Sequence, residues 1–371
     1  MKRAQVFFLQ ARNRHMKSPG QRFLTLIEAL RWDFLKQYQT VALKIHFGEE
    51  GATGYIHHVY PRVLVDFLKS NGTRPFLTDT NTLYHGKRSN GVDHLELAIR
   101  NGFGFECIHA PLVIADGIRS HSVTEVSAGP RHFKTVKIGA AIHEADCLVT
   151  LNHFKGHLVT SFGGAIKNLS MGCASRATKQ RMHADIKPAL KKNDTCTGCG
   201  SCARICPAAA IVIQSGKAAF DWQKCIGCAE CLSECPEGAI RIEWGGSSRS
   251  VQEKMAEVAM AVERTFRGRS MHFNFLLTIT PECDCLKATD NPIVQDIGIL
   301  ASSDPVAIDQ ASLDLVNAQP SLHDCALDSA QNPIHDKFLA IHPDVDPTAQ
   351  LEYGESIGLG CREYELIHVE D

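Results

Sequence analysis

The sequence predicts an α/β fold, in which a mainly parallel sheet with flanking helices is interrupted by a small α+β domain. Apolar strands and amphipathic helices alternate along most of the 371 residues, which is typical of parallel sheets. Eight of the fifteen cysteines instead gather between residues 196 and 235. We therefore expect a discontinuous α/β domain, residues 1–186 with 247–371, and an inserted domain at 187–246.

The first half of the α/β domain begins with an apolar stretch at residues 4–11. This stretch predicts a strand rather than a signal peptide, because it is short and runs directly into Arg12. Ser18 before Pro19 begins a helix, whose apolar residues recur at steps of three and four as far as Tyr38. Further expected elements are a strand at 41–46, a helix from Pro61 to before Gly72, and strands at 75–78, 112–115 and 147–151.

The second half resumes after the inserted domain. Ser250 and Glu253 have the spacing of a capping box, and they predict the start of a helix that ends at Gly268. Strands are expected at 272–279 and 297–300. Pro305 begins another helix at its first turn, with Asp304 as the residue that caps it.

The inserted domain contains the spacing C-x-x-C-x-x-C-x-x-x-C-P twice. In two-cluster bacterial ferredoxins the fourth cysteine of each run ligates the other cluster. We therefore assign one 4Fe–4S cluster to Cys196, Cys199, Cys202 and Cys235, and the second to Cys225, Cys228, Cys231 and Cys206. Glycines such as Gly198 and Gly200 let the chain coil closely around a cluster.

Zinc and disulfides are the alternatives for these cysteines. Zinc sites usually pair two C-x-x-C knuckles, and disulfides need an oxidising compartment. The seven other cysteines form no disulfide framework, and no twin-arginine signal is present. We therefore expect iron–sulfur clusters and a reducing, cytoplasmic location.

A second chemical centre is predicted where the strands of the α/β domain end. Ligands of open parallel sheets bind beyond the carboxyl ends of the strands. Taken singly, the two aspartates 79 and 116 could be turn or cap residues instead of ligands, and His46 could be a core histidine instead of a site residue. The polar residues that follow the six strands are His46, Asp79, Asp116, His153, the run Cys283-Asp-Cys285, and Ser303 with Asp304.

The candidate catalytic residues are His153, Lys155, His157 and Lys167. The histidines could donate protons near neutral pH, and a loop could bring both to one metal or anion. The lysines could bind a small anionic substrate. The glycine pair at 163–164 precedes the short helix that carries Lys167, and such a helix start can bind an anion.

Three further cysteines, Cys173, Cys283 and Cys285, are candidates for an additional site. Two thiols separated by one residue can chelate a soft metal or a further cluster, or they can act as redox thiols. The alternative is that they are buried and inert. The pattern C-x-C is much less specific than the ferredoxin runs.

Composition excludes several classes of partner and cofactor. Lys+Arg 39 against Asp+Glu 41 gives a net charge of −2, which argues against a nucleic-acid binder. No window approaches the roughly 18 consecutive apolar residues of a membrane span. No Rossmann fingerprint, Walker loop or nucleophile elbow is present. A flavin stays open, because many flavin sites leave no short motif.

Six stretches of the sequence resemble one known family. They are KIHFGEEG, TDTNTLYHGKRSN, NHFKGH, FGGAIKNLSMGCASR, TPECDC and DIGILASSDPVAIDQAS. All six are similar to the iron–sulfur-centre proteins of domain-of-unknown-function family 362. The resemblance implies an α/β domain bearing two 4Fe–4S clusters and names no substrate.

The function that these features favour is that of an iron–sulfur redox protein. Its ferredoxin module would pass electrons to the His/Lys/Cys site and exchange them with a redox partner protein. One alternative is an electron-transfer subunit that has no substrate of its own. Another is a metal-dependent enzyme in which the clusters are structural. A free-standing carrier needs little more than the cluster domain, whereas most of these 371 residues lie outside it.

Overall fold

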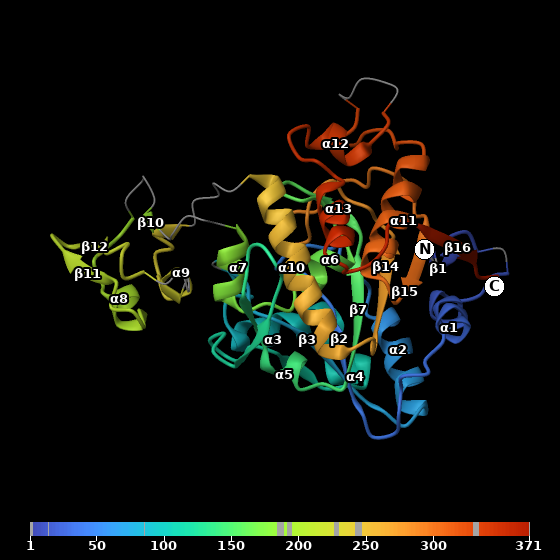
Figure 1. Ribbon diagram of the computed structural model, residues 1–371, viewed down its shortest axis with the longest axis horizontal. Coiled ribbons are helices and arrows are strands. Elements are labelled where there is room, and N and C mark those ends of the chain that lie inside the picture. The colour runs from blue at the N-terminus through green and yellow to red at the C-terminus, as the bar shows by residue number, and fades with distance from the viewer. Residues whose placement is uncertain are drawn as a thin grey trace.

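The computed structural model describes residues 3–13, 15–84, 86–183, 189–190, 195–225, 230–241, 247–328 and 334–370. A central eight-stranded sheet runs through the larger part of the molecule, with helices on both faces (Figure 1). The predicted α/β class with a large, mainly parallel sheet is therefore confirmed. In spatial order the strands are β16 (Tyr364–His368), β1 (Ala4–Gln10), β15 (Gly298–Ser302), β14 (Ser270–Leu276), β7 (Cys147–His153), β2 (Thr40–Lys44), β3 (Arg74–Asp79) and β4 (Leu112–Ile114).

Strand direction decides which strand ends meet. Only β15 runs against its neighbours β1 and β14 in this sheet, and every other pair is parallel. The carboxyl ends of β14, β7, β2, β3 and β4 therefore lie at one edge, as predicted. Ser303 and Asp304 follow β15 and lie at the opposite edge, so the prediction that they join the others was wrong.

Asp304 has the capping role that its position before Pro305 predicts. Its Oδ1 accepts hydrogen bonds from the backbone N–H groups of Val306 and Ala307, both at 2.9 Å. These residues begin α11 (Pro305–Ala318). The carboxylate thus satisfies two of the unpaired amides of the first turn.

Two apolar cores lie on the two faces of the sheet. Side chains that alternate along a strand enter opposite cores: Leu148 of β7 belongs to the first core, whereas Val149 belongs to the second. The first core also receives residues of α5 (Ala140–His143), α6 (Ala165–Ser170), α7 (Arg176–His183), α10 (Ser248–Phe266), α11, α12 (Lys337–Ile341) and α13 (Ala349–Ser356). The second receives residues of α1 (Pro19–Ala29), α2 (Val59–Ser70), α3 (Gly91–Ala98), the π-helix Ile99–Phe103 and α4 (Phe105–Ile108).

Two predicted helix boundaries differ from the structure. The capping box of Ser18 is present, but α1 ends at Ala29 rather than near Tyr38. Leu30 is extended, and the Trp32 indole N–H donates to the Ile27 carbonyl at 2.9 Å, which closes the helix end.

Helix α10 is capped three residues earlier than predicted. The Ser247 side chain accepts from the Ser250 N–H, so Ser247 is the capping residue. Glu253, the other expected member of the box, contacts His132 at 2.8 Å and Arg131 at 3.1 Å. Its carboxylate therefore ties α10 to another segment instead of closing the helix start.

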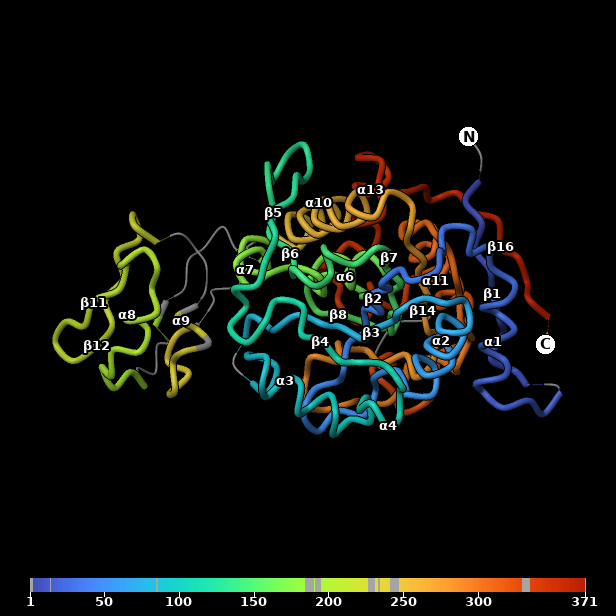
Figure 2. The backbone as a smooth tube through the Cα atoms, turned by 90° about the horizontal axis from the view of Figure 1, so that it is seen from below, coloured from blue at the N-terminus to red at the C-terminus, as the bar shows by residue number. Residues whose placement is uncertain are grey.

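The cysteine-rich segment lies at one end of the molecule, beside α7 and α3 (Figures 1 and 2). The short strands predicted at 210–213 and 239–242 correspond to β11 (Ile211–Gln214) and β13 (Ile240–Arg241), and residue 242 lies outside the described residues. Predicted boundary residues 186, 187 and 246 lie outside the described residues. The helices and strands of the cysteine-rich segment are β10 (Ala189–Leu190), α8 (Ser201–Ile205), β11 (Ile211–Gln214), β12 (Lys217–Phe220), α9 (Glu230–Ser233) and β13 (Ile240–Arg241).

Among the described residues, Leu83 and Arg119 contact this segment from the α/β part. Leu83 packs into its apolar cluster with Cys202, Leu232 and Cys235. Arg119 lies 3.4 Å from Glu234 at the surface. Leu83 belongs to the loop that follows β3, so the cysteine-rich segment contacts the edge where the parallel strands end.

Two hairpins complete the α/β part, β5 (Val123–Ser127) with β6 (Thr135–Gly139), and β8 (Lys155–His157) with β9 (Ser161–Gly163). Of the helices that the structure describes, none combines the length and apolar character needed to cross a bilayer.

Candidate functional site

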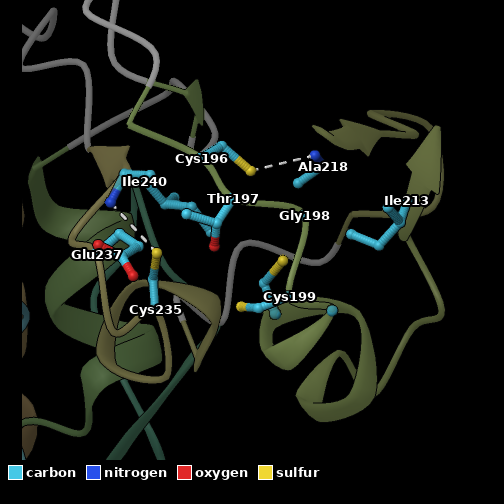
Figure 3. Close-up of a pocket in the computed structure, with 12 residues that line it drawn as sticks. Cys196, Thr197, Gly198, Cys199, Ile213, Ala218, Cys235, Glu237 and Ile240 are labelled. Atoms are coloured by element: carbon cyan, nitrogen blue, oxygen red, sulfur yellow. Dashed lines mark hydrogen bonds between the residues drawn. The ribbon is translucent and has the colours of Figure 1, made fainter. Parts of the chain in front are cut away.

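Four cysteines line one hollow in the cysteine-rich segment. They are Cys196, Cys199 and Cys202 from the first run and Cys235 from the second. Figure 3 shows Cys196, Cys199 and Cys235 around this hollow. These are the four residues assigned to one cluster from spacing alone, and their ligation of a cluster stays a prediction.

The coil around this hollow requires glycine. Gly198 and Gly200 have φ values of +68° and +76°, a region that side chains with a Cβ rarely adopt. A Cβ at Gly198 would also lie 2.4 Å from the carbonyl oxygen of Gly216. The glycines therefore let the first run bend back over its own cysteines.

Backbone amides donate to cysteine sulfurs in both halves of the segment. The N–H of Ala210 lies 3.2 Å from the Cys206 Sγ, and the N–H of Ala239 lies 3.2 Å from the Cys235 Sγ. Each amide is four residues after the Cys-Pro cysteine, so the internal repeat is preserved in three dimensions. Hydrogen bonds to sulfur stabilise negative charge on a thiolate or cluster.

The second predicted cysteine set can be described only in part. Cys225, Cys231 and Cys206 are among the described residues, and Cys231 is buried. Cys228 lies outside the described residues. The assignment of this set stays a prediction.

A second cluster of reactive side chains lies at the carboxyl edge of the parallel strands. One ligating atom each from His157, Cys283 and Cys285 falls within 4.8 Å of the others, a grouping compatible with metal binding. The Lys167 Nζ donates to the Cys283 Sγ at 3.2 Å. The structure thus brings together two of the predicted catalytic residues and two of the three additional cysteines.

The glycine of the NHFKGH motif allows this cluster to form. Gly156 of β8 lies against the loop that leads from β14 to Cys283, and its N–H donates to the Thr280 carbonyl at 2.9 Å. A Cβ at Gly156 would lie 1.9 Å from the carbonyl oxygen of Pro281. Any larger residue would push the Cys283 loop away from His157.

The orientation of the His157 ring follows from its backbone neighbours. Its Nδ1 accepts from the N–H groups of Val159 at 3.1 Å and Thr160 at 3.2 Å. The proton of the neutral ring therefore resides on Nε2, which is left to donate to Cys283. Burial lowers the pKa of His157, and the nearby Lys167 lowers it further.

The two thiols of the C-x-C run have opposite protonation preferences. A hydrogen bond from Cys285 holds the pKa of Cys283 well below its ordinary value against the effect of burial, with Lys167 and His157 acting in the same direction. The same hydrogen bond, together with burial, raises the pKa of Cys285 well above its ordinary value. Both pKa shifts, together with the Lys167 contact to Cys283, favour a thiolate on Cys283 and a thiol on Cys285.

His153 and Lys155, the other predicted catalytic residues, hold Asp284 in place. The His153 Nδ1 lies 2.8 Å from the Asp284 Oδ1, and the Lys155 Nζ lies 3.5 Å from Oδ2. Burial would raise the pKa of Asp284, but these two residues hold it below its ordinary value. The His153 Nε2 faces the Leu277 carbonyl at 2.9 Å, so both ring nitrogens are engaged in fixing the loop.

Cys173 does not join Cys283 and Cys285. Its Sγ lies 3.7 Å from the Asn168 carbonyl oxygen, and burial raises the pKa of this thiol to about 12. Lys44 and Asp79, which pair at 2.9 Å, shift the pKa of Cys173 in opposite directions. Cys173 is therefore a buried neutral thiol, and His157 occupies the third place in the cluster.

The anion site predicted at the glycine pair is filled by the protein itself. Asp309 accepts from the N–H groups of Ala165 at 2.7 Å and Ile166 at 2.9 Å, at the start of α6. A Cβ at Gly164 would lie 2.2 Å from the Asp309 Oδ1. The glycine thus makes room for an internal carboxylate rather than for a ligand.

Two buried residues near the cluster, Glu49 and Arg88, and the half-buried Tyr84 escaped the sequence-based prediction. Arg88 lies 3.1 Å from Glu49, and the Tyr84 hydroxyl donates to Glu49 at 3.1 Å. A negative charge on Cys285 would raise the pKa of both Arg88 and Tyr84. Glu49 lies in the KIHFGEEG stretch, and Tyr84 and Arg88 lie in the TDTNTLYHGKRSN stretch. Glu49 and Arg88 are 39 residues apart, and no sequence pattern indicates that residues so far apart will pair.

His46 lies at the same edge. Its Nδ1 accepts from the Gly48 N–H at 3.0 Å, and its buried Nε2 has no hydrogen-bond partner among the described residues. Burial holds the pKa of His46 well below its ordinary value, and Arg88 lowers it further. His46 is therefore a neutral ring that offers one unpaired N–H.

Comparisons with known proteins support the family and little more. No curated protein matches the sequence. A crystal structure of a Thermotoga maritima protein is 12% identical with a TM-score of 0.39, over 69% of this chain and 49% of that one. The lactate racemase apoprotein from Thermoanaerobacterium thermosaccharolyticum is 11% identical with a TM-score of 0.41, over 82% and 57%. The chain spans about half the length of these structures, and likeness at this level carries no functional argument.

The family model described as "Domain of unknown function (DUF362)" matches residues 41–314. The match includes the cysteine-rich segment and every residue of the His157–Cys283 cluster. It covers well over half of the 371 residues, and the chain therefore belongs to the DUF362 family.

Proposed function

We propose that this protein is an iron–sulfur redox protein that holds two 4Fe–4S clusters and exchanges electrons between them and the site around Cys283. The observation that carries the proposal is the hollow lined by Cys196, Cys199, Cys202 and Cys235. The fourth ligand comes from the other run, which is the crossing that two-cluster ferredoxins use.

The residues present fit such a cluster. Four thiols surround one hollow, two glycines in positive φ let the chain coil there, and an Ala218 N–H approaches the Cys196 Sγ at 3.4 Å. Every described cysteine is free, which favours a cluster over disulfides. When bound, the clusters would supply electrons one at a time.

The contact through Leu83 supports exchange between the two parts of the protein. Leu83 packs beside Cys202 and Cys235. The next residue is Tyr84, whose pKa is raised by the charge of Cys285. The loop that contains Leu83 and Tyr84 therefore leads from the cysteine-rich segment toward the Cys283 site.

A redox partner protein would dock on the outer face of the cysteine-rich segment. Cys199 is exposed there, and the apolar side chains of Val212, Ile213 and Trp222 are exposed nearby in sequence. Exposed apolar side chains around a redox centre fit a transient protein partner. The same feature supports the alternative of an electron-transfer subunit with no substrate of its own.

A metal-dependent enzyme with structural clusters is the other alternative. Its support is the grouping of His157, Cys283 and Cys285, whereas the set expected from the sequence was Cys173, Cys283 and Cys285. It requires a metal ion bound by these residues in addition to the clusters. A variant in which both Cys283 and Cys285 are replaced should then lose this metal.

The test is to purify the full chain without oxygen and measure iron, acid-labile sulfide and the electron paramagnetic resonance spectrum after reduction. We expect about eight iron and eight sulfide ions per chain, the content of two 4Fe–4S clusters. The variant C235S should alter the same resonance signal as C196S, and C225S a different one. The exposed Cys107 lies outside the segment, so C107S is the matched control.

Two results would contradict the proposal. Colourless protein that contains zinc instead of iron would remove the clusters altogether. If C235S and C225S altered the same signal while C196S altered the other, the crossed assignment would be wrong.

A further inference from the structure

The sulfur of Cys283 is surrounded by hydrogen-bond donors. The Lys167 Nζ lies 3.2 Å away, and His157 and Cys285 both place their donor atoms within 4.8 Å. Cys283 itself is only 4% exposed. A buried sulfur with an ammonium and two further donors directed at it is an environment that stabilises a thiolate.

The same geometry argues against a metal at this position. Coordination by His157 needs a free lone pair, yet Nδ1 is occupied by two backbone N–H groups and Nε2 carries the proton. A metal would also have to lie beside the Lys167 ammonium. Both features disfavour a cation and favour a thiolate paired with a thiol.

We propose that Cys283 and Cys285 form a redox-active pair that interconverts between a thiolate with its neighbouring thiol and a disulfide. On oxidation the two sulfurs form one S–S bond, the Cys285 S–H releases its proton, and two electrons leave. Two bound 4Fe–4S clusters would each accept one of these electrons, so this step rests on the proposed function. On reduction, two electrons and one proton return, the S–S bond breaks, and the thiolate and thiol form again.

The position of the two thiols in the chain suits this step. Both belong to one turn, so the approach from within 4.8 Å to an S–S bond of about 2 Å needs only local rotation. Cys285 is half-buried, and the residues that follow it, 286–291, are exposed. The proton can therefore leave on the solvent side while Cys283 stays enclosed.

The experiment compares full-length protein reduced with dithionite and protein oxidised anaerobically with a mediator dye. Samples are quenched in acid, alkylated after unfolding and digested, and the peptide that contains both cysteines is analysed by mass spectrometry. We expect two alkyl groups on the reduced peptide and none, with a loss of two hydrogens, on the oxidised one. Peptides of Cys107 and Cys325 should carry one group each in both states.

The role of Lys167 is tested by the pH dependence of Cys283 alkylation in the C285S variant. An adjacent cation lowers a thiol pKa by at least about one unit, so adding K167Q should slow alkylation at neutral pH about tenfold or more. The rate should recover at high pH, and K167R should retain most of it. Circular dichroism confirms that each variant is folded.

Three results would overturn the proposal. The peptide could be alkylated twice under all redox conditions. The double variant C283S/C285S could lose a stoichiometric metal, which would make the thiols ligands. K167Q could leave the pH profile unchanged. The iron content and resonance spectrum of the same samples report separately on the clusters, so failure of the thiol pair is distinguishable from failure of the proposed function.

Discussion

Replacement of Gly156 by alanine tests how the Cys283 site is assembled. Gly156 lies in β8 where the loop from β14 passes, and its N–H donates to the Thr280 carbonyl at 2.9 Å. An alanine Cβ would lie 1.9 Å from the Pro281 carbonyl oxygen and 2.5 Å from its carbon. These are backbone atoms, so the loop has to move by more than an ångström to restore a normal contact.

The cost of this movement follows from the contacts that change. Forcing extra volume into a packed site costs about 1–3 kcal/mol, and loss of the hydrogen bond to Thr280 adds about 1 kcal/mol. The reduced freedom of an unfolded alanine returns about 0.5–1 kcal/mol. We expect a net loss of about 2–3 kcal/mol in the free energy of unfolding. For a domain of this size that corresponds to a fall in melting temperature of about 3–5 °C.

The loop movement should also change the chemistry of Cys283. If the Lys167–Cys283 contact of 3.2 Å is lost, the thiol should react more slowly with an alkylating agent at neutral pH. Thermal unfolding followed by circular dichroism and the alkylation rate of the C285S background are the two measurements. Iron content should stay unchanged, because the cysteine-rich segment is not touched.

The matched control is G86A, since a Cβ at Gly86 would meet only one atom, at 4.0 Å. Its free energy of unfolding should change by less than about 0.5 kcal/mol. If G156A melted at the wild-type temperature and Cys283 kept its alkylation rate, the idea that this glycine seats the loop would be refuted.

Three further predictions concern buried charges and the contact between the two parts. K44M should lower the free energy of unfolding by about 3 kcal/mol in chemical denaturation, because buried Asp79 loses its closest partner at 2.9 Å and keeps only the longer contacts to His94 and Arg88. Exposed Lys36 replaced by methionine should have no comparable effect. Asp284 has a lowered pKa in the folded state. Its ionised form therefore makes its full contribution to the free energy of unfolding above the ordinary carboxyl pKa of about 4, and this contribution is lost as pH falls below that value. The melting temperature of the wild type should therefore fall more steeply below pH 5 than that of D284N, and parallel curves would contradict this. L83A should cost about 2 kcal/mol or more and speed proteolysis of the cysteine-rich segment at unchanged iron content, whereas an unchanged cleavage rate would show that Leu83 does not hold the two parts together.

The sequence alone determined those features that are local along the chain. Apolar periodicity predicted α1, α2 and α10 and, in the large sheet, every strand except β16. The capping residues Ser18 and Asp304 are where their neighbours Pro19 and Pro305 indicate. The repeated cysteine spacing singled out four residues that now line one hollow. Such signals are readable because each depends on residues within a few positions of one another.

Only the tertiary structure decided which distant residues meet. The sequence could not show that β15 runs against its neighbours, which removes Asp304 from the site. Nor could it show that His157 rather than Cys173 joins Cys283 and Cys285. These outcomes depend on strand direction and on close contacts such as that between Gly156 and Pro281, where residues far apart in the chain come together. Spacing along the sequence carries no information about such contacts, because packing sets them.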